Sequence, residues 1–347
     1  CYPNLLDGLV ALAGLTGDPR LVDEARYIAR VSLRDSEFEN HHSHGRLTAY
    51  RGLLDLGRLT GEREFLEAVA SGCNHIRDNY LLPTGGVPEI FNRTYLRDEG
   101  CSNADWVRVN VLLWQATENP SYLDAAEHAL HNHLLATQYP NGGFGHYNLK
   151  NLRDEGREYP GGGLSNIGSD SYWCCSMHVA QLLAEAVQRG ILVSRDDVWV
   201  TWLAEVRAEF TVNGKKRTVI AEKTAPTMWK VEVDAAGPVS FTLRLRVPGW
   251  AEAITLDGES RSSQTGWVDL SREWAGSTVL HVGVPDTVRY AGAYDAHAEE
   301  GEPARVFAGR DLYCLPDVYV GRDLSPSDRV QTLVMAAEHP TDRTIPV

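Results

Sequence analysis

No apolar run in the sequence approaches the roughly 20 residues that a helix needs to cross a bilayer. The chain is also short of positive charge, because 33 Lys and Arg residues face 47 Asp and Glu residues and the formal net charge is -14. A surface this acidic repels phosphate backbones and anionic lipid headgroups. We therefore expect partners other than nucleic acids and membranes.

Cysteines are few, and their positions do not form the pattern of a disulfide framework. Six are present, scattered along the chain except for the adjacent pair Cys174 and Cys175. Adjacent cysteines rarely bond to each other because the ring they close is strained. Free thiolates that bind a metal in a reducing compartment fit better, so we expect a cytoplasmic protein. The first residue is Cys1 rather than Met, so this expectation rests on the cysteines and not on the presence or absence of a signal peptide.

The first half of the chain repeats one pattern three times: an amphipathic helix, a short turn and a second amphipathic helix. The turns lie at Thr16, Thr60 and Thr117. In the first two, Gly17 and Gly61 supply the left-handed conformation that ends a helix. One helix pair cannot bury both apolar faces alone, so repeated pairs stack into a solenoid or a toroid.

The period of the hydrophobic pattern changes to two near Asp197. Runs such as VSFTLRLRVPGW and TVLHVGVP alternate or are continuously apolar, and Gly, Pro and Asp separate them. This pattern is typical of a β-sandwich. We therefore predict a multidomain protein, α then β, in three segments. They are part of an (α/α)6 barrel that carries the active site (1–195), a β-sandwich (196–320) and a C-terminal segment where a further β region would begin (321–347).

Long glycine-rich loops separate the helix pairs, at 81–100 and 139–171. They carry aromatic residues, histidines and acids rather than the residues of a plain linker. Loops of this length within a compact domain are usually functional or disordered, and we favour function here.

Two short cysteine motifs lie at the ends of these loops, DEGC at 98–101 and WCC at 173–175. Zinc binds thiolates and accepts carboxylates in tetrahedral sites of four ligands. The candidate ligands are Glu99, Cys101, Cys174 and Cys175. A thiolate at the start of a helix has a lowered pKa, which would favour the doublet as thiolates. The residues alone leave open that these are buried free cysteines acting as small hydrophobic side chains, since a doubled C-x-x-C spacing is missing.

Five stretches of the chain resemble the β-L-arabinofuranosidases, glycoside hydrolase family 127 and its relatives, formerly a domain of unknown function. They are SHGRLTAYRGLLDLGRLTG (43–61), GGVPEIF (85–91), DEGCSNADW (98–106), YWCCSMHVAQLL (172–183) and VSFTLRLRVPGWAE (239–252). The resemblance covers residues 1–320 and begins midway through the family's helical barrel. It therefore implies that several N-terminal helices of the barrel are missing here.

The resemblance also implies a zinc site with a cysteine nucleophile. In that family a Glu-x-Cys pair and a Cys-Cys pair bind zinc, and the first cysteine of the doublet attacks the anomeric carbon. By position, Glu99, Cys101 and Cys175 would be zinc ligands. Cys174 would be both a ligand and the nucleophile. Gly100 and the Trp-Cys-Cys-Ser-Met-His context depart from the family's pattern, which indicates a divergent subfamily and leaves its substrate open.

A retaining glycosidase also needs an acid that protonates the leaving oxygen, about 5–5.5 Å from the nucleophile. Glu89 in GGVPEIF is the candidate, and it matches the family's acid/base position. Its apolar neighbours Val87, Ile90 and Phe91 would raise its pKa and keep it protonated. The alternative is a loop glutamate exposed to solvent, with no role in the site.

Four further residues are candidates for contact with the sugar. The family places a sugar-binding histidine at His44, in the cluster HHSH, although a helix cap or a solvent-facing cluster would look the same. His146 lies in a glycine-rich loop and is a second pocket candidate. Tyr172 and Trp173 offer aromatic faces on which a sugar ring could stack, and the alternative for both is core packing.

Some polar and aromatic residues near these motifs are expected to have no part in the site. Asp105 and Trp106 follow Cys101 closely and would begin a helix rather than touch substrate. His131 and His133 lie two apart on a predicted helix and face different ways, so they do not form a ligand pair.

Together these patterns predict a retaining glycoside hydrolase that acts on β-L-arabinofuranoside-like or related sugars through a zinc-bound cysteine. The expected partner is an oligosaccharide or glycoside substrate. Two alternatives stay open. One is a toroidal hydrolase or lyase with carboxylate chemistry only, and the other is a non-catalytic carbohydrate-binding protein in which zinc is a structural staple.

Overall fold

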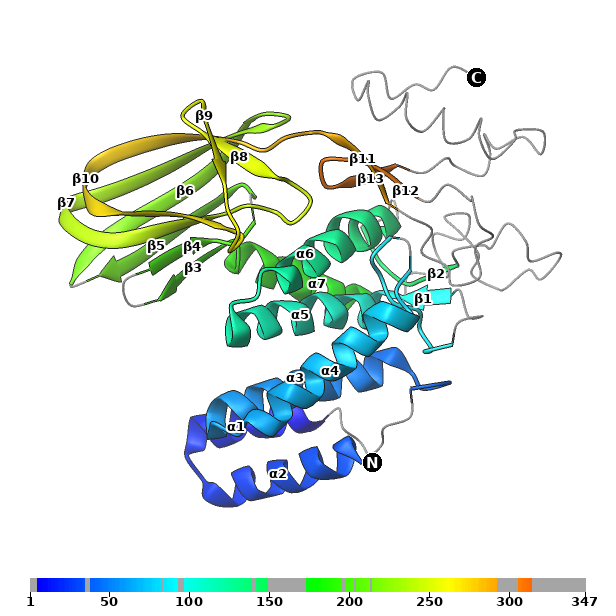
Figure 1. Cartoon of the computed structure of the whole chain (residues 1–347). Coiled ribbons are helices and arrows are strands. Elements are labelled where there is room, and N and C mark those ends of the chain that lie inside the picture. Colours follow the sequence, from blue (N-terminus) through cyan, green and yellow to red (C-terminus); the bar gives the residue numbers. More distant parts are fainter. Residues whose placement is uncertain are drawn as a thin grey trace, which may run out of the picture. The chain divides into compact units, whose positions relative to one another are not determined.

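The computed structural model describes residues 5–34, 38–82, 84–92, 97–138, 142–148, 173–194, 197–202, 204–212, 214–291 and 305–313 of the 347-residue chain. The chain divides into two compact units, Cys1–Leu182 and Leu183–Val347. Helices make up most of the first unit and strands most of the second (Figure 1). This order of helices followed by β-sheet confirms the fold class predicted from the hydrophobic periods.

The helical unit is built from consecutive helix pairs and one small sheet. Its helices are α1 (Leu6–Thr16), α2 (Pro19–Leu33), α3 (Ser43–Thr60), α4 (Arg63–Asn79), α5 (Gly100–Thr117), α6 (Ser121–Ala129) and α7 (Trp173–Gln188). A π-helical turn (Leu130–Leu134) and a 3-10 turn (Leu135–Thr137) extend α6. The short strands β1 (Arg97–Glu99) and β2 (His146–Asn148) pair antiparallel. Strand β1 leads directly into α5.

The turns within the helix pairs form as the sequence predicts. Gly17 and Gly61 have φ angles of 68° and 76°, and their left-handed backbone ends α1 and α3. In the third pair Glu118 takes the same conformation, with φ at 57°, although it has a side chain. Asp18 caps α2 by accepting a hydrogen bond of 2.9 Å from the backbone N–H of Arg20.

The helices pack in two alternating sets. Helices α1, α3 and α5 pack side by side, and α2, α4 and α6 each pack against the helix that precedes them in the chain. Helices α1 and α3 approach closely at Gly52, where a Cβ atom would lie 2.7 Å from Leu6 Cγ and 2.8 Å from the backbone nitrogen of Asp7. This arrangement is that of stacked (α/α) pairs.

The β unit contains strands of very different length. They are β3 (Ile191–Ser194), β4 (Asp197–Val200), β5 (Val206–Val212), β6 (Lys215–Ala225), β7 (Met228–Arg246), β8 (Ala253–Leu256), β9 (Glu259–Ser262), β10 (Trp267–Gly283), β11 (Val288–Ala291), β12 (Arg305–Ala308) and β13 (Asp311–Tyr313). Strands β3 to β10 form one eight-stranded sheet, and β11 to β13 form a separate three-stranded sheet.

The long strand β7 organises the larger sheet. It pairs antiparallel with β10 on one side, with a register shift between Trp274 and Gly276. On its other side it pairs with β6 through its first half and parallel with β4 through its second half. Buried apolar side chains alternate along β7, as the period of two predicts. They form one core with side chains of the neighbouring strands, including Trp274.

Among the described residues, none of the helices combines the length and the apolar character that crossing a bilayer requires. The predicted C-terminal segment, 321–347, lies outside the described residues, and so do Cys1 and Cys314. The boundary between 195 and 196 stays a prediction.

Candidate active site

The two cysteine motifs lie at the starts of two helices of the same unit. Glu99 ends strand β1, and Cys101 follows in the first turn of α5. The backbone N–H of Gly100 donates a 2.9 Å hydrogen bond to Gly145, which fixes this strand-to-helix junction. Cys174 and Cys175 lie in the first turn of α7. Cys101, Cys174 and Cys175 therefore all lie at helix starts.

Three sulfur atoms converge at these helix starts. The Sγ atoms of Cys101, Cys174 and Cys175 all lie within 4.8 Å of one another. Cys101 Sγ is 3.5 Å from Cys175 Sγ, and Cys174 Sγ is 4.0 Å from Cys175 Sγ. Cys101 and Cys175 are buried, and Cys174 is partly exposed. The arrangement leaves Cys174 as the sulfur that a substrate can reach.

Gly100 allows the two motifs to meet. A Cβ atom at this position would lie 3.1 Å from Val179 Cγ2, 3.2 Å from Cys175 Cβ and 3.4 Å from Phe144 Cβ. Most real Cβ atoms keep a longer distance, so a larger residue would push α7 and its cysteines away from α5. The glycine that departs from the family's Glu-x-Cys pattern thus has a packing reason in this chain.

The sulfurs favour the thiol form as long as no cation is near them. The interaction with Cys175, followed by burial, raises the pKa of the Cys101 thiol. Burial, followed by the charge of Cys175, raises the pKa of the Cys174 thiol. The lowering expected from the helix start is therefore outweighed by burial and by the neighbouring sulfurs. A bound divalent cation would reverse this balance, because coordinated thiols lose their protons.

Glu99 lies beside the sulfurs but belongs to a second cluster. Its carboxylate, the Glu89 carboxylate and a ring nitrogen of His42 lie within 4.8 Å of one another. Glu99 Oε1 accepts a 2.9 Å hydrogen bond from the Ser102 hydroxyl and lies 3.2 Å from His42 Nε2. Its negative charge also raises the pKa of Cys101, so the two clusters adjoin. The predicted four-ligand set thus divides into three sulfurs and one neighbouring carboxylate.

Glu89 is held at the site by its backbone. Its carbonyl oxygen accepts a 2.9 Å hydrogen bond from the backbone N–H of Ser43 at the start of α3, and the Ser43 hydroxyl is also 2.9 Å away. Val87 and Phe91 are buried on either side, whereas Glu89 is partly exposed. The loop is therefore anchored by buried apolar residues, and its carboxylate points to the carboxylate cluster.

Asn103 joins the Glu89 loop to the Glu99 turn. Its Oδ1 accepts a 2.8 Å hydrogen bond from the backbone N–H of Val87, and its Nδ2 lies 3.2 Å from the carbonyl oxygen of Val87. The same Nδ2 donates to the carbonyl oxygen of Glu99 at 3.1 Å. Asn103 is fully buried. One amide side chain therefore sets the separation between the two loops that carry the carboxylates.

A buried His–Asp pair also contacts the loop that carries Glu89. His133 Nε2 forms a short hydrogen bond with Asp98 Oδ2, and His133 Nδ1 lies 2.7 Å from Thr84 Oγ1. A Cβ atom on Gly86 would lie 2.5 Å from the His133 ring, so only glycine lets the loop approach it. His131 and His133 lie in the same π-helical turn, and their not forming a ligand pair stays a prediction.

His44 lies beside Cys101 and forms a hydrogen bond with a buried carboxylate. Its Nδ1 donates a 2.8 Å hydrogen bond to Asp105 Oδ2. Asp105 was expected to begin a helix rather than touch substrate, and it lies one turn inside α5 with a fully buried side chain. Burial raises its pKa, but the hydrogen bond from His44 and the charges of Arg51 and Arg108 lower it to about 2. The sequence did not reveal this hydrogen-bond network, because a sequence does not show which helix face meets α3.

His178 completes this side of the site, and sequence reasoning missed it. Its ring lies edge-on to the His44 ring with centroids 4.9 Å apart. Ring nitrogens of His44 and His178 lie within 4.8 Å of Cys101 Sγ and of each other. Burial lowers the pKa of His178. One signal was available, because His178 follows Cys174 by four residues on α7 and therefore shares its helix face.

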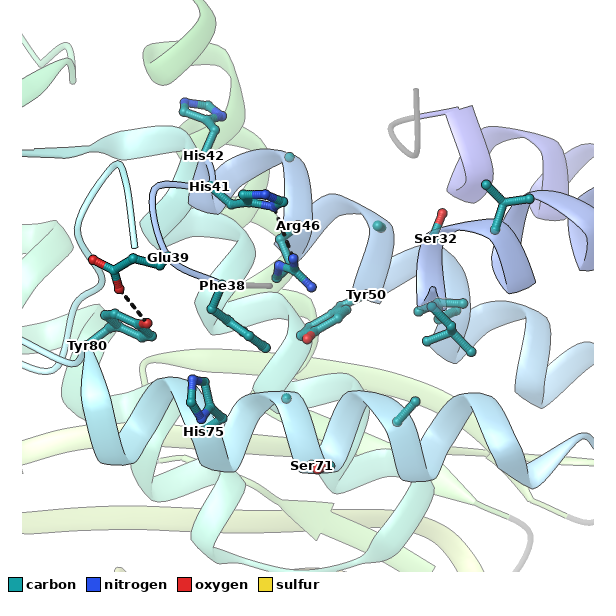
Figure 2. A pocket seen from close by; sticks show the side chains of 17 residues that line it. Ser32, Phe38, Glu39, His41, His42, Arg46, Tyr50, Ser71, His75 and Tyr80 are labelled. Atoms are coloured by element: carbon teal, nitrogen blue, oxygen red, sulfur yellow. Dashed lines mark hydrogen bonds between the residues drawn. The ribbon is translucent and has the colours of Figure 1, made fainter. Parts of the chain in front are cut away.

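A cavity of about 850 Å³ has His42 among its lining residues, which Figure 2 shows. It opens between α3 and α4, and His42 belongs both to its wall and to the carboxylate cluster. The Phe38 ring stacks on Tyr80 with centroids 6.4 Å apart, and the Arg46 guanidinium lies 4.3 Å from the Phe38 centroid. Tyr80 donates a 3.0 Å hydrogen bond to Glu39. These contacts form the cavity wall.

Some predicted sugar contacts cannot be placed. Tyr172 lies outside the described residues. His146 and Trp173 lie in described elements, β2 and the start of α7, but their side chains are outside the description. Their roles stay predictions.

Two profiles of one glycoside hydrolase family match the chain. The family profile described as "Beta-L-arabinofuranosidase, GH127 catalytic domain" matches residues 2–188, and the profile of the GH127 middle domain matches residues 221–285. A comparison with curated proteins finds no significant match.

Solved structures share the fold at low identity. A GH127 β-L-arabinofuranosidase from Geobacillus stearothermophilus T6 is 17% identical with a TM-score of 0.73, over 89% of this chain and 58% of that chain. A GH127 β-arabinofuranosidase is 22% identical with a TM-score of 0.70, over 88% of this chain and 55% of that one. A third match, a glycoside hydrolase, is 17% identical with a TM-score of 0.75, over 90% and 60%. The chain thus spans less than two thirds of each.

Proposed function

Because the chain belongs to the GH127 family of glycoside hydrolases, we propose that it is a retaining glycosidase in which Cys174 attacks the sugar and Glu89 serves as acid and base. The observation that carries this proposal is the convergence of three sulfurs beside two carboxylates. Such a set offers both a nucleophile and a proton donor. The chain spans less than two thirds of the length of the matched structures, and the activity proposed is that of the whole length.

The sulfur cluster fits a zinc ion. Its three sulfurs come from two helix starts, lie within 4.8 Å of one another and include two buried atoms. Thiolates are the ligands that zinc prefers, and a carboxylate can complete the tetrahedron. Cys101, Cys174 and Cys175 would hold the ion, with Glu99 as the adjoining carboxylate. When bound, zinc would lower the pKa of the coordinated thiols and keep Cys174 as a thiolate.

In the first step the Cys174 sulfur forms a bond to the anomeric carbon as the bond from this carbon to the glycosidic oxygen breaks. Glu89 donates its proton to the departing oxygen. In the second step Glu89 takes a proton from water, the water oxygen bonds to the anomeric carbon, and the carbon–sulfur bond breaks. Two displacements at one carbon give retention of configuration.

Other residues of the site would position the sugar. His44 lies beside Cys101, and we propose that it bonds a hydroxyl of the sugar under attack. His42 holds Glu99 through a 3.2 Å contact and adjoins the cavity, which could receive the leaving portion of the substrate. We propose a β-L-arabinofuranoside or a related furanoside as the substrate class, on the strength of family membership.

A carboxylate-only mechanism also has an observation in its favour. The Glu89 and Glu99 carboxylates lie within 4.8 Å of each other, near the about 5–5.5 Å of a retaining carboxylate pair. In that mechanism Glu99 would attack and the cysteines would be structural. The cysteine variants described next separate the two mechanisms.

The test is hydrolysis of p-nitrophenyl β-L-arabinofuranoside by the wild-type chain, Cys174→Ser and Glu89→Gln, with zinc content measured for each. We expect about one zinc per chain and loss of activity by at least about 100-fold in both variants. Cys174→Ser should keep its zinc, because Cys101 and Cys175 remain. Activity retained in Cys174→Ser but lost in Glu99→Gln would establish the carboxylate-only mechanism. Binding of the sugar without turnover would indicate a carbohydrate-binding protein.

A further inference from the structure

Asp105 has more donors than a carboxylate at a helix start requires. It lies in α5 and faces α3, which supplies the donors His44, Thr48 and Arg51. Thr48 Oγ1 donates to Oδ2 at 2.9 Å, and Arg51 Nη1 donates to Oδ1 at 2.8 Å. Arg108, one turn further along α5, lies 3.3 Å from Oδ1. The side chain is fully buried, so these groups replace its water shell.

The two arginines explain why Asp105 is ionised, but they do not explain why it lies beside His44. A buried carboxylate paired with two guanidinium groups stays ionised and accepts hydrogen bonds only. His44 Nδ1 lies 2.8 Å from Oδ2, so this nitrogen must carry the proton. The Nε2 atom is then the ring nitrogen left to accept a hydrogen bond from another group.

The surroundings of His44 keep its ring in this orientation. The His178 ring packs edge-on against it at 4.9 Å, and Thr48 Oγ1 lies 3.4 Å from Nδ1. The ring lies beside Cys101 and retains partial exposure, with 19% of its side-chain surface accessible. A group that reaches the sulfurs from solvent would therefore meet a histidine whose tautomer is already set.

We propose that Asp105 is a positioning residue that holds His44 as the Nδ1–H tautomer and presents Nε2 as an acceptor for a hydroxyl of the sugar. The proposal rests on the proposed function for the identity of the ligand, but the tautomer follows from contacts of this chain alone. It assigns the site a preference for a sugar with a hydroxyl donor at this point. A deoxy sugar or a methylated sugar at that position would lose the bond.

The tautomer can be read directly by nitrogen NMR of the chain labelled with 15N-histidine and loaded with zinc. The sequence has 12 histidines, so the His44 signals are assigned by their loss in His44→Gln. We expect a protonated Nδ1 and an unprotonated Nε2 in the wild-type chain at neutral pH. A protonated Nε2 and a bare Nδ1 would overturn the proposal. This measurement needs no activity and no Asp105 variant.

Variants then test whether Asp105 sets the tautomer. Asp105→Asn keeps the shape of the side chain but can also offer N–H donors, so we expect His44 to lose its uniform Nδ1–H state. Thr48→Val is the matched control, because it removes a bond to the same Oδ2 and the 3.4 Å contact with Nδ1 but leaves the bond between His44 and Asp105 in place. We expect the tautomer to be unchanged in Thr48→Val. A tautomer that is unchanged in folded Asp105→Asn would contradict the proposal.

A double-mutant cycle tests the link to catalysis. With the chromogenic arabinofuranoside, Asp105→Asn should lower kcat/KM by about 10- to 100-fold. In a His44→Gln background the same change should lower it by less than about threefold, because its effect passes through His44. Equal losses in both backgrounds would show a merely structural role. If Cys174→Ser and Glu89→Gln keep full activity, the proposed function fails, while the NMR result still decides the role of Asp105.

Discussion

The helical unit and the β unit bury different kinds of side chain. The core of the β unit is almost entirely apolar, and its buried polar residues are Thr201, Arg217 and Arg246 among those described. The helical unit buries many more, most of them around the two cysteine motifs. They include Ser43, Thr48, Asp98, Glu99, Ser102, Asn103, Asp105, Arg108, Asn110, Glu127 and His133.

The two units therefore differ in how much of their burial costs free energy. A buried polar group costs free energy unless it is hydrogen-bonded, so a network of them persists only where each member has a partner. In the helical unit the partners are loops and helix starts that carry Glu89, Glu99 and the cysteines. In the β unit, Phe241 and Trp274 stack with ring centroids 5.3 Å apart, which requires no such network. The buried polar groups of the first unit thus hold its loops and helix starts in place, and the second unit is stabilised mainly by packing.

The largest expected effect is on catalysis in the helical unit. Glu89→Gln removes the proton donor while keeping the size of the side chain, and we expect kcat to fall by about 100- to 10,000-fold. Thermal unfolding should change little, because the hydrogen bonds to the backbone carbonyl of Glu89 hold the loop and remain in the variant. Steady-state kinetics and thermal unfolding measure the two quantities. A large loss of stability would show that the carboxylate is structural.

The largest expected effect on stability is in the β unit. Trp274 is 1% exposed, and its Nε1 donates a 3.0 Å hydrogen bond to the carbonyl oxygen of Phe241. Trp274→Ala should lower the free energy of unfolding by about 3–5 kcal/mol, because it opens a cavity in the core. The affinity of the chain for zinc should not change. Trp274→Phe is the matched variant and should cost less. Weaker zinc binding in the folded variant would contradict the separation of roles.

Removing the Asn103 side chain should lower both the stability of the chain and its catalytic rate. Asn103→Ala leaves the backbone N–H and carbonyl of Val87 without their partner, which we expect to cost about 2–3 kcal/mol of unfolding free energy. Because Asn103 also holds Glu99, kcat should fall as well. Asn103→Asp can still accept from Val87 but cannot donate, so it should recover part of the stability. Denaturant unfolding and kinetics give the result, and unchanged kcat would show that the clamp is purely structural.

The smallest effect is a dependence of stability on acid. The pKa of Asp105 is about 2 in the folded chain, below its usual value of 3.8. Its contribution is therefore present above about pH 4 and is lost as the pH falls through about 2. The shift corresponds to about 2 kcal/mol. Denaturant unfolding between pH 5 and 2 should show this loss, and Asp105→Asn should abolish it. An equal loss in the variant would assign it to other carboxylates.

Several parts of the fold could be predicted because they depend on neighbours in the chain. The helix ends at Gly17 and Gly61 follow from the left-handed conformation of glycine, and the alternation along β7 follows from the pleat of a strand. The convergence of Cys101 with Cys174 and Cys175 was also predicted, as one of two interpretations of the motifs and then from a family resemblance, because residues so far apart in sequence have no local reason to meet. The position of Glu99 outside the sulfur trio was not predicted.

Local chemistry along the sequence thus determined the helix pairs and the strands. The sequence also contains the thiols and carboxylates that the proposed metal site and the proposed glycosidase mechanism need. Only the tertiary structure decided which of these groups meet. Asp105 became the partner of His44, and His178 joined Cys101, because α5 and α7 present particular faces to α3 and to each other. A helix face has neighbours only when another helix packs on it, and that packing depends on the apolar surface of the whole unit.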